Sequence, residues 1–223
     1  RESPMITSFD AGFDIGGTRL KYGLVGRDGR LVHKGQVRSP EAMADILAVL
    51  EEAWVSLKRK APGPIKSCGF GIAGFYSLKE RKILQSPNYP SLNGYPLIPA
   101  LRKFIDVPVR IGNDANMAAY GEFRHGAGRG VRNLVLFTVG TGIGGGIILD
   151  GKVWEGEGGF AGELGHITVN PEGELCGCGR RGCLETEASA PRMVRNYQTL
   201  TGRTDVTDSR EIYLLAKAGD SAA

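Results

Sequence analysis

The stretch that decides the fold reads Phe13-Asp14-Ile15-Gly16-Gly17-Thr18, and it follows an apolar segment that predicts a strand over 5–14. Two successive glycines let backbone N–H groups approach a phosphate closely, and Thr18 adds a hydroxyl donor. The carboxylate of Asp14 is suited to Mg²⁺, which takes oxygen ligands. Glycine pairs are also common in simple hairpin turns, so this stretch alone leaves both interpretations open.

Outward from this turn, the apolar pattern predicts alternating strands and helices. Further strands are expected over 20–25, 31–37, 65–73, 107–111, 133–139 and 147–149. Helices are expected over 40–59, starting after Ser39, and over 96–104, 115–124 and 209–218. Asp28-Gly29 predicts a hairpin between two strands, and the Pro-, Asn- and Ser-rich segment 79–95 predicts a surface loop.

A second glycine-rich turn, Gly140-Thr141-Gly142-Ile143-Gly144-Gly145-Gly146, repeats the chemistry of the first. A phosphate chain clamped from both sides needs two such turns. Neither turn matches the Walker pattern or the Gly-x-Gly-x-x-Gly dinucleotide fingerprint in its strand–turn–helix context. The repeat predicts an α/β protein with two related lobes, 5–114 and 115–223, and a cleft between them.

Asn113 and Asp114 lie at a predicted strand end, where α/β folds present reactive groups. A carboxylate there can take the proton of a hydroxyl that attacks phosphorus, while Asn113 orients the acceptor by hydrogen bonds. Asp114 also stands just before a predicted helix. Capping that helix is an equally good interpretation from spacing alone.

One imidazole and three thiols, His166, Cys176, Cys178 and Cys183, fall within eighteen residues of the chain. These four residues can fill all positions of a tetrahedral zinc site, which is typical of a structural metal. The alternatives are a disulfide, or cysteines that cluster by chance, and the nearby histidine favours zinc. Glu163 and Glu185 flank the cluster and could accept hydrogen bonds from sugar hydroxyls, although most glutamates are simply exposed surface charge.

Composition excludes some classes of protein. The net charge is +4 over 223 residues, and no dense Lys/Arg stripe with interleaved aromatic residues is present, so nucleic acid is not an expected partner. No apolar run of about 18 residues predicts a membrane span. With no visible signal peptide and three of the four cysteines assigned to a metal, we expect the cytoplasm.

Taken together, these stretches resemble the ROK family of sugar kinases and sugar-responsive repressors. The matching segments occur in family order and read Phe13-Asp14-Ile15-Gly16-Gly17-Thr18, Gly112-Asn113-Asp114-Ala115-Asn116, Val139 to Gly146, Gly162-Glu163-Leu164-Gly165-His166 and Cys176 to Glu185. The resemblance implies an actin-like, ribonuclease-H-like two-lobe ATPase fold with a structural zinc site. It also implies transfer of the γ-phosphoryl group of ATP to the 6-hydroxyl of a hexose, with glucose expected first.

The resemblance assigns roles to residues. Asp114 is the implied general base. The implied sugar contacts are Asn113, Glu163, His166 and Glu185, with His166 also a zinc ligand. Bound Zn²⁺ would lock the loop that carries both glutamates and do no chemistry. The implied nucleotide contacts, with Mg²⁺, are Gly12, Phe13, Asp14, Ile15, Gly16, Gly17, Thr18, Arg19, Val139, Gly140, Thr141, Gly142, Ile143, Gly144, Gly145 and Gly146.

Other functions remain open at this point. The same motifs occur in kinases of N-acetylglucosamine, N-acetylmannosamine and other hexoses, and Ala73 stands where many relatives carry proline. A sugar-sensing regulator is disfavoured because only thirteen residues precede Asp14, too few for a DNA-binding domain. A sugar-binding module without catalysis is the third reading. Relatives continue past Ala223, so we expect the chain to be C-terminally incomplete, and a homodimer is expected from relatives.

Overall fold

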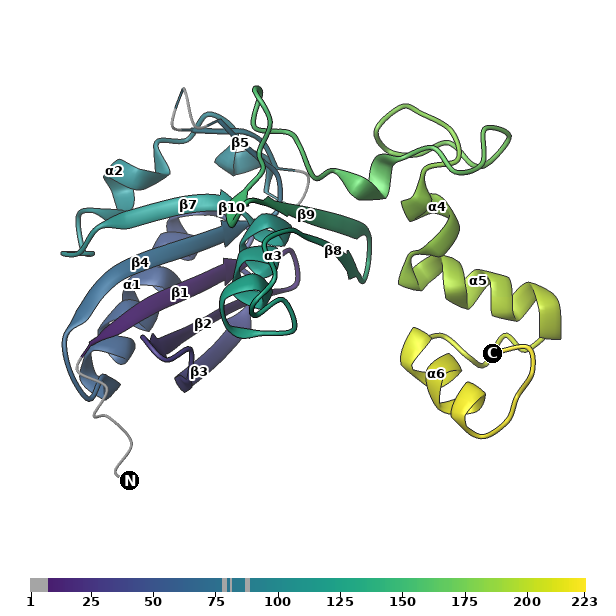
Figure 1. Ribbon diagram of the computed structural model, residues 1–223, viewed down its shortest axis with the longest axis horizontal. Coiled ribbons are helices and arrows are strands. Elements are labelled where there is room, and N and C mark those ends of the chain that lie inside the picture. The colour runs from purple at the N-terminus through teal and green to yellow at the C-terminus, as the bar shows by residue number, and fades with distance from the viewer. Residues whose placement is uncertain (1–7, 78–79, 81, 87–88) are drawn as a thin grey trace. The chain divides into compact units, whose positions relative to one another are not determined.

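The computed structural model describes residues 8–77, 80, 82–86 and 89–223 (Figure 1). Its strands are β1 (Phe9–Ile15), β2 (Arg19–Gly26), β3 (Leu31–Arg38), β4 (Ile65–Ile72), β5 (Phe75–Ser77), β6 (Lys82–Gln85), β7 (Val109–Asn113), β8 (Leu134–Val139), β9 (Ile143–Leu149) and β10 (Lys152–Val153). Its helices are α1 (Met43–Lys60), α2 (Leu97–Leu101), α3 (Asp114–His125), α4 (Leu184–Ala188), α5 (Ala190–Thr201) and α6 (Ser209–Lys217), with 3₁₀ turns η1 (Pro90–Leu92) and η2 (Leu164–His166). Within the described ranges, no helix combines the length and apolar character needed to cross a membrane.

A five-stranded sheet with the order β3-β2-β1-β4-β7 forms the larger part of the fold. β1, β2 and β3 pair antiparallel, whereas β4 and β7 continue the sheet parallel to β1. In register, Ile15 pairs with Ile72, and Ile72 pairs with Asn113. The three parallel strands therefore end at one edge of the sheet, which is the edge where α/β folds place their functional loops.

Alternation along β1 gives this sheet two different faces. Phe9, Ala11, Phe13 and Ile15 are buried, and α1 covers their face with a stripe that includes Trp54. The rings of Phe13 and Phe70 stack with centroids 4.8 Å apart. Each large apolar side chain buried in this way stabilises the fold by about 1.5–3 kcal/mol. Helix α3 lies on the opposite face (Figure 1).

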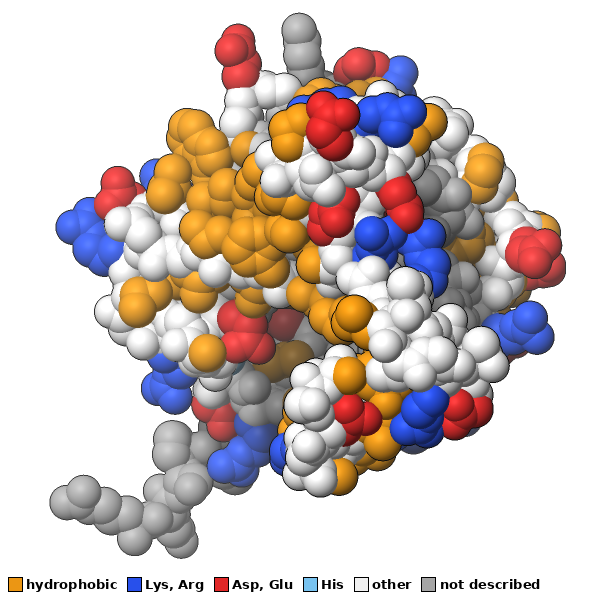
Figure 2. Space-filling view, turned by 90° about the vertical axis from the view of Figure 1, so that its right-hand side faces the viewer, with side chains coloured by type: hydrophobic (Ala, Val, Ile, Leu, Met, Phe, Trp, Pro, Cys, Tyr) orange, Lys and Arg blue, Asp and Glu red, His pale blue; other side chains and the backbone are white. Residues whose placement is uncertain are grey.

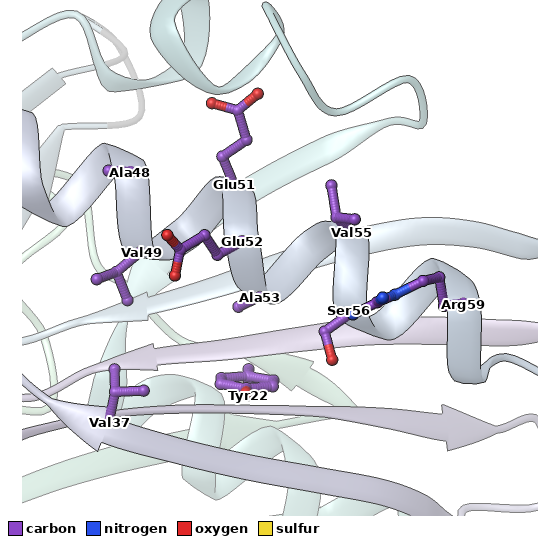
Figure 3. Close-up of a pocket in the computed structure, with 10 residues that line it drawn as sticks. All are labelled: Tyr22, Val37, Ala48, Val49, Glu51, Glu52, Ala53, Val55, Ser56 and Arg59. Atoms are coloured by element: carbon purple, nitrogen blue, oxygen red, sulfur yellow. The ribbon is translucent and has the colours of Figure 1, made fainter.

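A shallow groove of about 620 Å³ follows α1 (Figure 3). Tyr22 of β2 and Val37 of β3 point from the sheet toward the helix, and the helix contributes residues between Ala48 and Arg59. None of the residues predicted for catalysis, sugar binding or metal binding lines it. We therefore assign this groove to helix packing and look for the chemistry at the edge of the sheet.

A second sheet has the order β10-β9-β8 among the described strands. Along β8, partly buried residues alternate with exposed ones, and the exposed ones are the apolar Val135, Phe137 and Val139. Figure 2 shows apolar side chains, coloured orange, gathered on the surface beside charged side chains in blue and red. Single exposed apolar residues are ordinary, but three on one face of one strand are not.

The chain divides into two compact units. One consists of Arg1–Leu134 with Ile147–Ala161, and the other of Val135–Gly146 with Gly162–Ala223. Two catalytic-site candidates, Asn113 and Asp114, belong to the first unit, and the cysteine cluster belongs to the second. The lobe division at 114/115 stays a prediction.

Most predicted elements are present, and several details differ from the prediction. Segment 79–95 is not simply a surface loop, because it contains β6 and η1 with buried Ile83 and Leu92; residues 79, 81, 87 and 88 of that prediction lie outside the described residues. Helix α1 starts at Met43 rather than after Ser39. Helices α4 and α5 were not anticipated. Residues 5–7 of the first predicted strand also lie outside the described residues.

Candidate functional site

Asp114 is the first residue of α3, directly after β7. Glycines in two neighbouring strands make room for the first turn of α3, Gly71 beside Asp114 and Gly112 beside Met117. Gly71 of β4 pairs with Gly112 of β7, and a Cβ on Gly71 would lie 3.3 Å from the Cα of Asp114. The first turn of α3 can therefore rest on bare backbone. No role in packing was predicted for these glycines, although their place at two adjacent strand ends was a usable signal.

The cap of α3 is Asn113, not Asp114. The Asn113 Oδ1 accepts a hydrogen bond from the Asn116 N–H at 3.0 Å. Its Nδ2 donates to the carbonyl oxygen of Gly74 at 3.2 Å, which ties β7 to the loop after β4. The helix-cap interpretation of Asp114 is thus wrong: the preceding asparagine has the extended backbone that a capping residue needs.

Burial raises the pKa of the Asp114 carboxyl above its ordinary value. A hydrogen bond donated by the Ala115 N–H to Oδ1, at 2.9 Å, opposes this rise in pKa, and the negative charge of Asp14 adds to it. A carboxylate that holds a proton more tightly is a better general base near neutral pH, as long as it stays ionised. Asp14 itself forms an ion pair with Lys21, with Oδ2 and Nζ 3.1 Å apart.

Two side chains form hydrogen bonds to the first glycine turn. The carbonyl oxygen of Gly16 accepts hydrogen bonds from the Ser39 hydroxyl at 2.5 Å and from the Tyr89 hydroxyl at 2.8 Å. The Ser39 N–H donates to the Thr18 carbonyl at 3.1 Å. Ser39 therefore supports this turn and does not cap α1. A hollow of about 660 Å³ on the same sheet includes Gly12 and Asp14 among its lining residues.

The second glycine turn is shorter than predicted. Only Gly140 to Gly142 form the turn, closed by the Gly140 N–H donating to the Gly142 carbonyl at 2.9 Å, and β9 already begins at Ile143. Runs of glycine suggest a loop from sequence, yet here they form a strand that other backbone approaches closely. A Cβ on Gly145 would lie 2.6 Å from the carbonyl oxygen of Gly162. Thr141 lines a groove of about 300 Å³ with the first residues of α5 and α6.

The four predicted metal ligands come together. Their ligand atoms all lie within 4.8 Å of one another. The Sγ atoms of Cys178 and Cys183 are 3.6 Å apart, and Cys176 Sγ lies 3.5 Å from His166 Nδ1. A zinc tetrahedron with bonds of about 2.3 Å to sulfur has edges of about 3.8 Å, so this donor set fits Zn²⁺. The described cysteines are free thiols, and the disulfide alternative is therefore wrong.

The loop that carries these ligands has its own framework. Gly179 N–H donates to the Cys176 carbonyl at 2.9 Å, and Gly182, with φ +61°, lies so close to Asn170 that no side chain fits there. Burial raises the pKa of the Cys183 thiol to about 12. A bound cation would stabilise the deprotonated thiolate in such buried surroundings.

An ionic network joins this loop to α5. Glu174 of the loop pairs with Arg192 and, at 3.0 Å, with Arg195. The hydrogen bonds from both arginines lower the pKa of Glu174. Sequence reasoning missed these residues because it did not anticipate α5. The signals were Pro191 near a helix start and Gly202 in the left-handed conformation just after the helix end.

Glu163 and Glu185 are both partly buried. Glu163 precedes η2, and its carbonyl oxygen accepts from the His166 N–H at 3.1 Å. Glu185 lies in α4, which begins directly after Cys183, and its Oε2 accepts from the Ile143 N–H at 2.8 Å. The second unit therefore brings these two glutamates, the cluster and the second glycine turn together, whereas Asn113, Asp114 and Asp14 share one sheet edge in the first. The roles of these residues stay predictions.

Comparisons with known proteins agree with this arrangement. A glucokinase of Streptomyces coelicolor is 37% identical over 208 residues, which cover 92% of this chain and 63% of the relative. An N-acetylmannosamine kinase of Citrobacter koseri is 34% identical over 217 residues, covering 94% of this chain and 70% of the relative. A solved ROK family glucokinase from Streptomyces griseus, in complex with glucose and AMPPNP, superposes with a TM-score of 0.82 at 34% identity, covering 96% of this chain and 72% of that one.

The chain thus spans less than two thirds of the length of the Streptomyces coelicolor glucokinase. The profile of the ROK family matches residues 10–223, which is nearly the whole chain. The resemblance drawn from five motifs is confirmed, and the chain belongs to the ROK family.

Proposed function

We propose that the protein transfers the γ-phosphoryl group of ATP to the 6-hydroxyl of a hexose, with glucose as the first candidate. The observation that carries the proposal is Asp114, a partly buried carboxyl at a strand end whose pKa is raised by burial. Relatives named glucokinase support glucose, and the solved relative that holds glucose and AMPPNP supports ATP as the donor.

Asp114 acts as the general base. As the sugar oxygen attacks the γ-phosphorus, its proton moves to Asp114, the bond from phosphorus to the bridging oxygen breaks, and ADP leaves. The Ala115 N–H holds one carboxylate oxygen at 2.9 Å, which leaves the other oxygen to receive the proton. General base catalysis of this kind contributes about a hundredfold or more to the rate.

The nucleotide phosphates are bound by the backbone of the two glycine turns, Gly12 to Arg19 and Val139 to Gly146. Asp14 is the carboxylate available to Mg²⁺, which supplies charge neutralisation at the phosphates when bound. Lys21 holds the Asp14 carboxylate at 3.1 Å and orients it.

Sugar hydroxyls are bound by Asn113, Glu163, His166 and Glu185. The two hydrogen bonds of the Asn113 side chain fix its orientation and leave one amide hydrogen for a hydroxyl. Zn²⁺ held by His166 and the three cysteines keeps the neighbouring glutamates in place and does no chemistry. Polar groups that are already oriented before the ligand binds select a sugar by the positions of its hydroxyl groups.

The test is a coupled ATP assay with a panel of glucose, N-acetylmannosamine and N-acetylglucosamine. It uses the protein in its longest available form, because the chain covers only part of its relatives' length. We expect ADP formation that depends on sugar, with the highest kcat/KM for glucose and the product phosphorylated at the 6-hydroxyl by NMR. A higher kcat/KM for N-acetylmannosamine would make that sugar the substrate in place of glucose. Absence of ATP turnover with all three sugars would reject the proposal.

A further inference from the structure

Glu185 contacts the second glycine turn, and it lies two residues after the predicted metal ligand Cys183. Its Oε2 accepts a hydrogen bond from the Ile143 N–H at 2.8 Å, directly after Gly142. A Cβ built on Gly142 would lie 2.3 Å from that same oxygen, and the three atoms nearest to that position all belong to Glu185. The carboxylate therefore lies against the turn at the position where glycine leaves room for it.

A second contact, made by Gly165, holds Ile143 at its carbonyl group. A Cβ built on Gly165 would lie 1.8 Å from the carbonyl oxygen of Ile143. Gly165 belongs to η2, one residue before the predicted ligand His166. The N–H of Ile143 is thus held by α4, and its carbonyl oxygen packs on the backbone of η2.

The start of the turn is hydrogen-bonded to the first residue of α5, which is separated from α4 by Ser189 alone. The Gly140 carbonyl accepts from the Ala190 N–H at 2.9 Å, and Ala190 follows α4 by two residues. Short α4 begins after Cys183 and carries Glu185 in its first turn. A displacement of the cysteine loop would therefore move α4, and with it both ends of the glycine turn.

We propose that Glu185 is a positioning residue for the glycine turn, in addition to the sugar contact proposed above. One carboxylate oxygen holds the Ile143 N–H, and the other is left for a sugar hydroxyl. A bound sugar then orders the same carboxylate that sets the turn, so that sugar binding and nucleotide binding favour each other. This coupling rests on the proposed function, whereas the contact of Glu185 with the turn does not.

Hydrogen exchange tests the contact without any assay of activity. We expect amide exchange in 140–146 to be about tenfold faster in Glu185→Ala, since a hydrogen bond to a charged acceptor is lost. Glu185→Gln keeps an acceptor oxygen and should restore most of the protection. Glu172→Ala, an exposed glutamate of the same loop, is the control and should leave exchange unchanged. Unchanged exchange in Glu185→Ala, with one zinc per chain retained, overturns the proposal.

A double-mutant cycle makes the test specific. Gly142→Ala should speed exchange in the parent protein because its methyl group displaces the Glu185 carboxylate. In the Glu185→Ala background the same change has nothing to displace, so its effect should fall to less than about twofold, as expected for two changes acting on one contact. Equal effects in both backgrounds overturn the proposal.

Kinetics test the coupling. Glu185→Ala should raise KM for ATP about tenfold together with KM for the sugar, because a lost charged hydrogen bond disturbs the turn. Glu172→Ala, at the exposed glutamate of the same loop, is the control and should leave both KM values unchanged. A Glu185→Ala enzyme with an unchanged KM for ATP overturns the coupling. If no sugar is phosphorylated at all, the proposed function fails while the exchange result still decides the contact.

Discussion

Strand β1 lies inside the five-stranded sheet, whereas strand β8 lies at the edge of the three-stranded one. β1 pairs with β2 on one side and β4 on the other, and every second side chain is buried under α1. β8 pairs with β9 at the edge of a sheet that has three strands among the described residues. Its Val135, Phe137 and Val139 are 58%, 48% and 57% exposed.

This difference shows that an alternating apolar pattern along a strand does not by itself produce a buried hydrophobic core. The first region gains its stability from apolar side chains of β1 and of the neighbouring strands β2 and β4, which are buried in one core. The second region contains short helices, glycine-rich strand and a cysteine loop, with few buried apolar residues in the described part. We propose that a metal ion bound by the four clustered ligands makes this region rigid.

Removing one ligand should have the largest effect. In Cys183→Ser we expect metal content to fall from near one per chain to near zero, because the buried thiolate is lost. Structural zinc sites contribute about 10 kcal/mol or more of binding free energy, so the loop 166–183 should lose its protection from hydrogen exchange. Strands β1 and β4 should keep theirs.

Cys68→Ser is the matched control for that experiment. Cys68 is buried in β4 and far in sequence from the cluster. This variant should keep its metal while losing about 1–3 kcal/mol of stability, since it buries a hydroxyl group. Loss of protection in β1 and β4 after Cys183→Ser would contradict the separation of the two regions.

A pair of phenylalanine truncations sharpens the comparison further. Phe70→Ala should lower the free energy of unfolding by about 3–5 kcal/mol, because it leaves a cavity against Phe13. Phe137→Ala should change it by about 0.5 kcal/mol or less, since nearly half of that side chain is already exposed. Denaturant titrations of both variants measure the difference, and similar losses would show that β8 is covered in solution.

The smallest effect concerns pH. The pKa of Asp114 is raised in the folded protein, so ionising this group costs stability as pH rises through the folded pKa. Asp114→Asn removes that cost and should raise the free energy of unfolding at pH 8. Below about pH 3 the carboxyl is protonated in both states, because the pKa of an unfolded aspartate is about 3.9, and the gain should vanish. Denaturation at both pH values measures it; a gain that is larger at low pH would contradict the assigned cause.

Sequence patterns predicted the elements of the first sheet well, because alternation on β1 and helical spacing on α1 report burial directly. They failed where a long-range contact decides local structure. Ser39 looked like a helix start, yet its hydroxyl is bonded to Gly16, 23 residues away. The glycines of β9 looked like a loop, yet the backbone at Gly162 packs on Gly145, and Gly165 packs on Ile143 at the start of the strand.

The site was partly predictable for a similar reason. The residue types of the cysteine cluster, together with its spacing, indicate a metal without further information. The supports of Asp114 were hidden, because Gly71 and Gly112 matter only through strand pairing. Likewise, Glu185 gives no sign in the sequence that it reaches Ile143, 42 residues earlier.

The central claim is that Asp114 removes the proton from the sugar hydroxyl. The most direct measurement is kcat of Asp114→Asn, together with glucose affinity by calorimetry, in a form of the protein that phosphorylates glucose. We predict that kcat falls by about a hundredfold or more while the dissociation constant for glucose changes little, because a base acts in the transition state. Unchanged kcat would contradict the account.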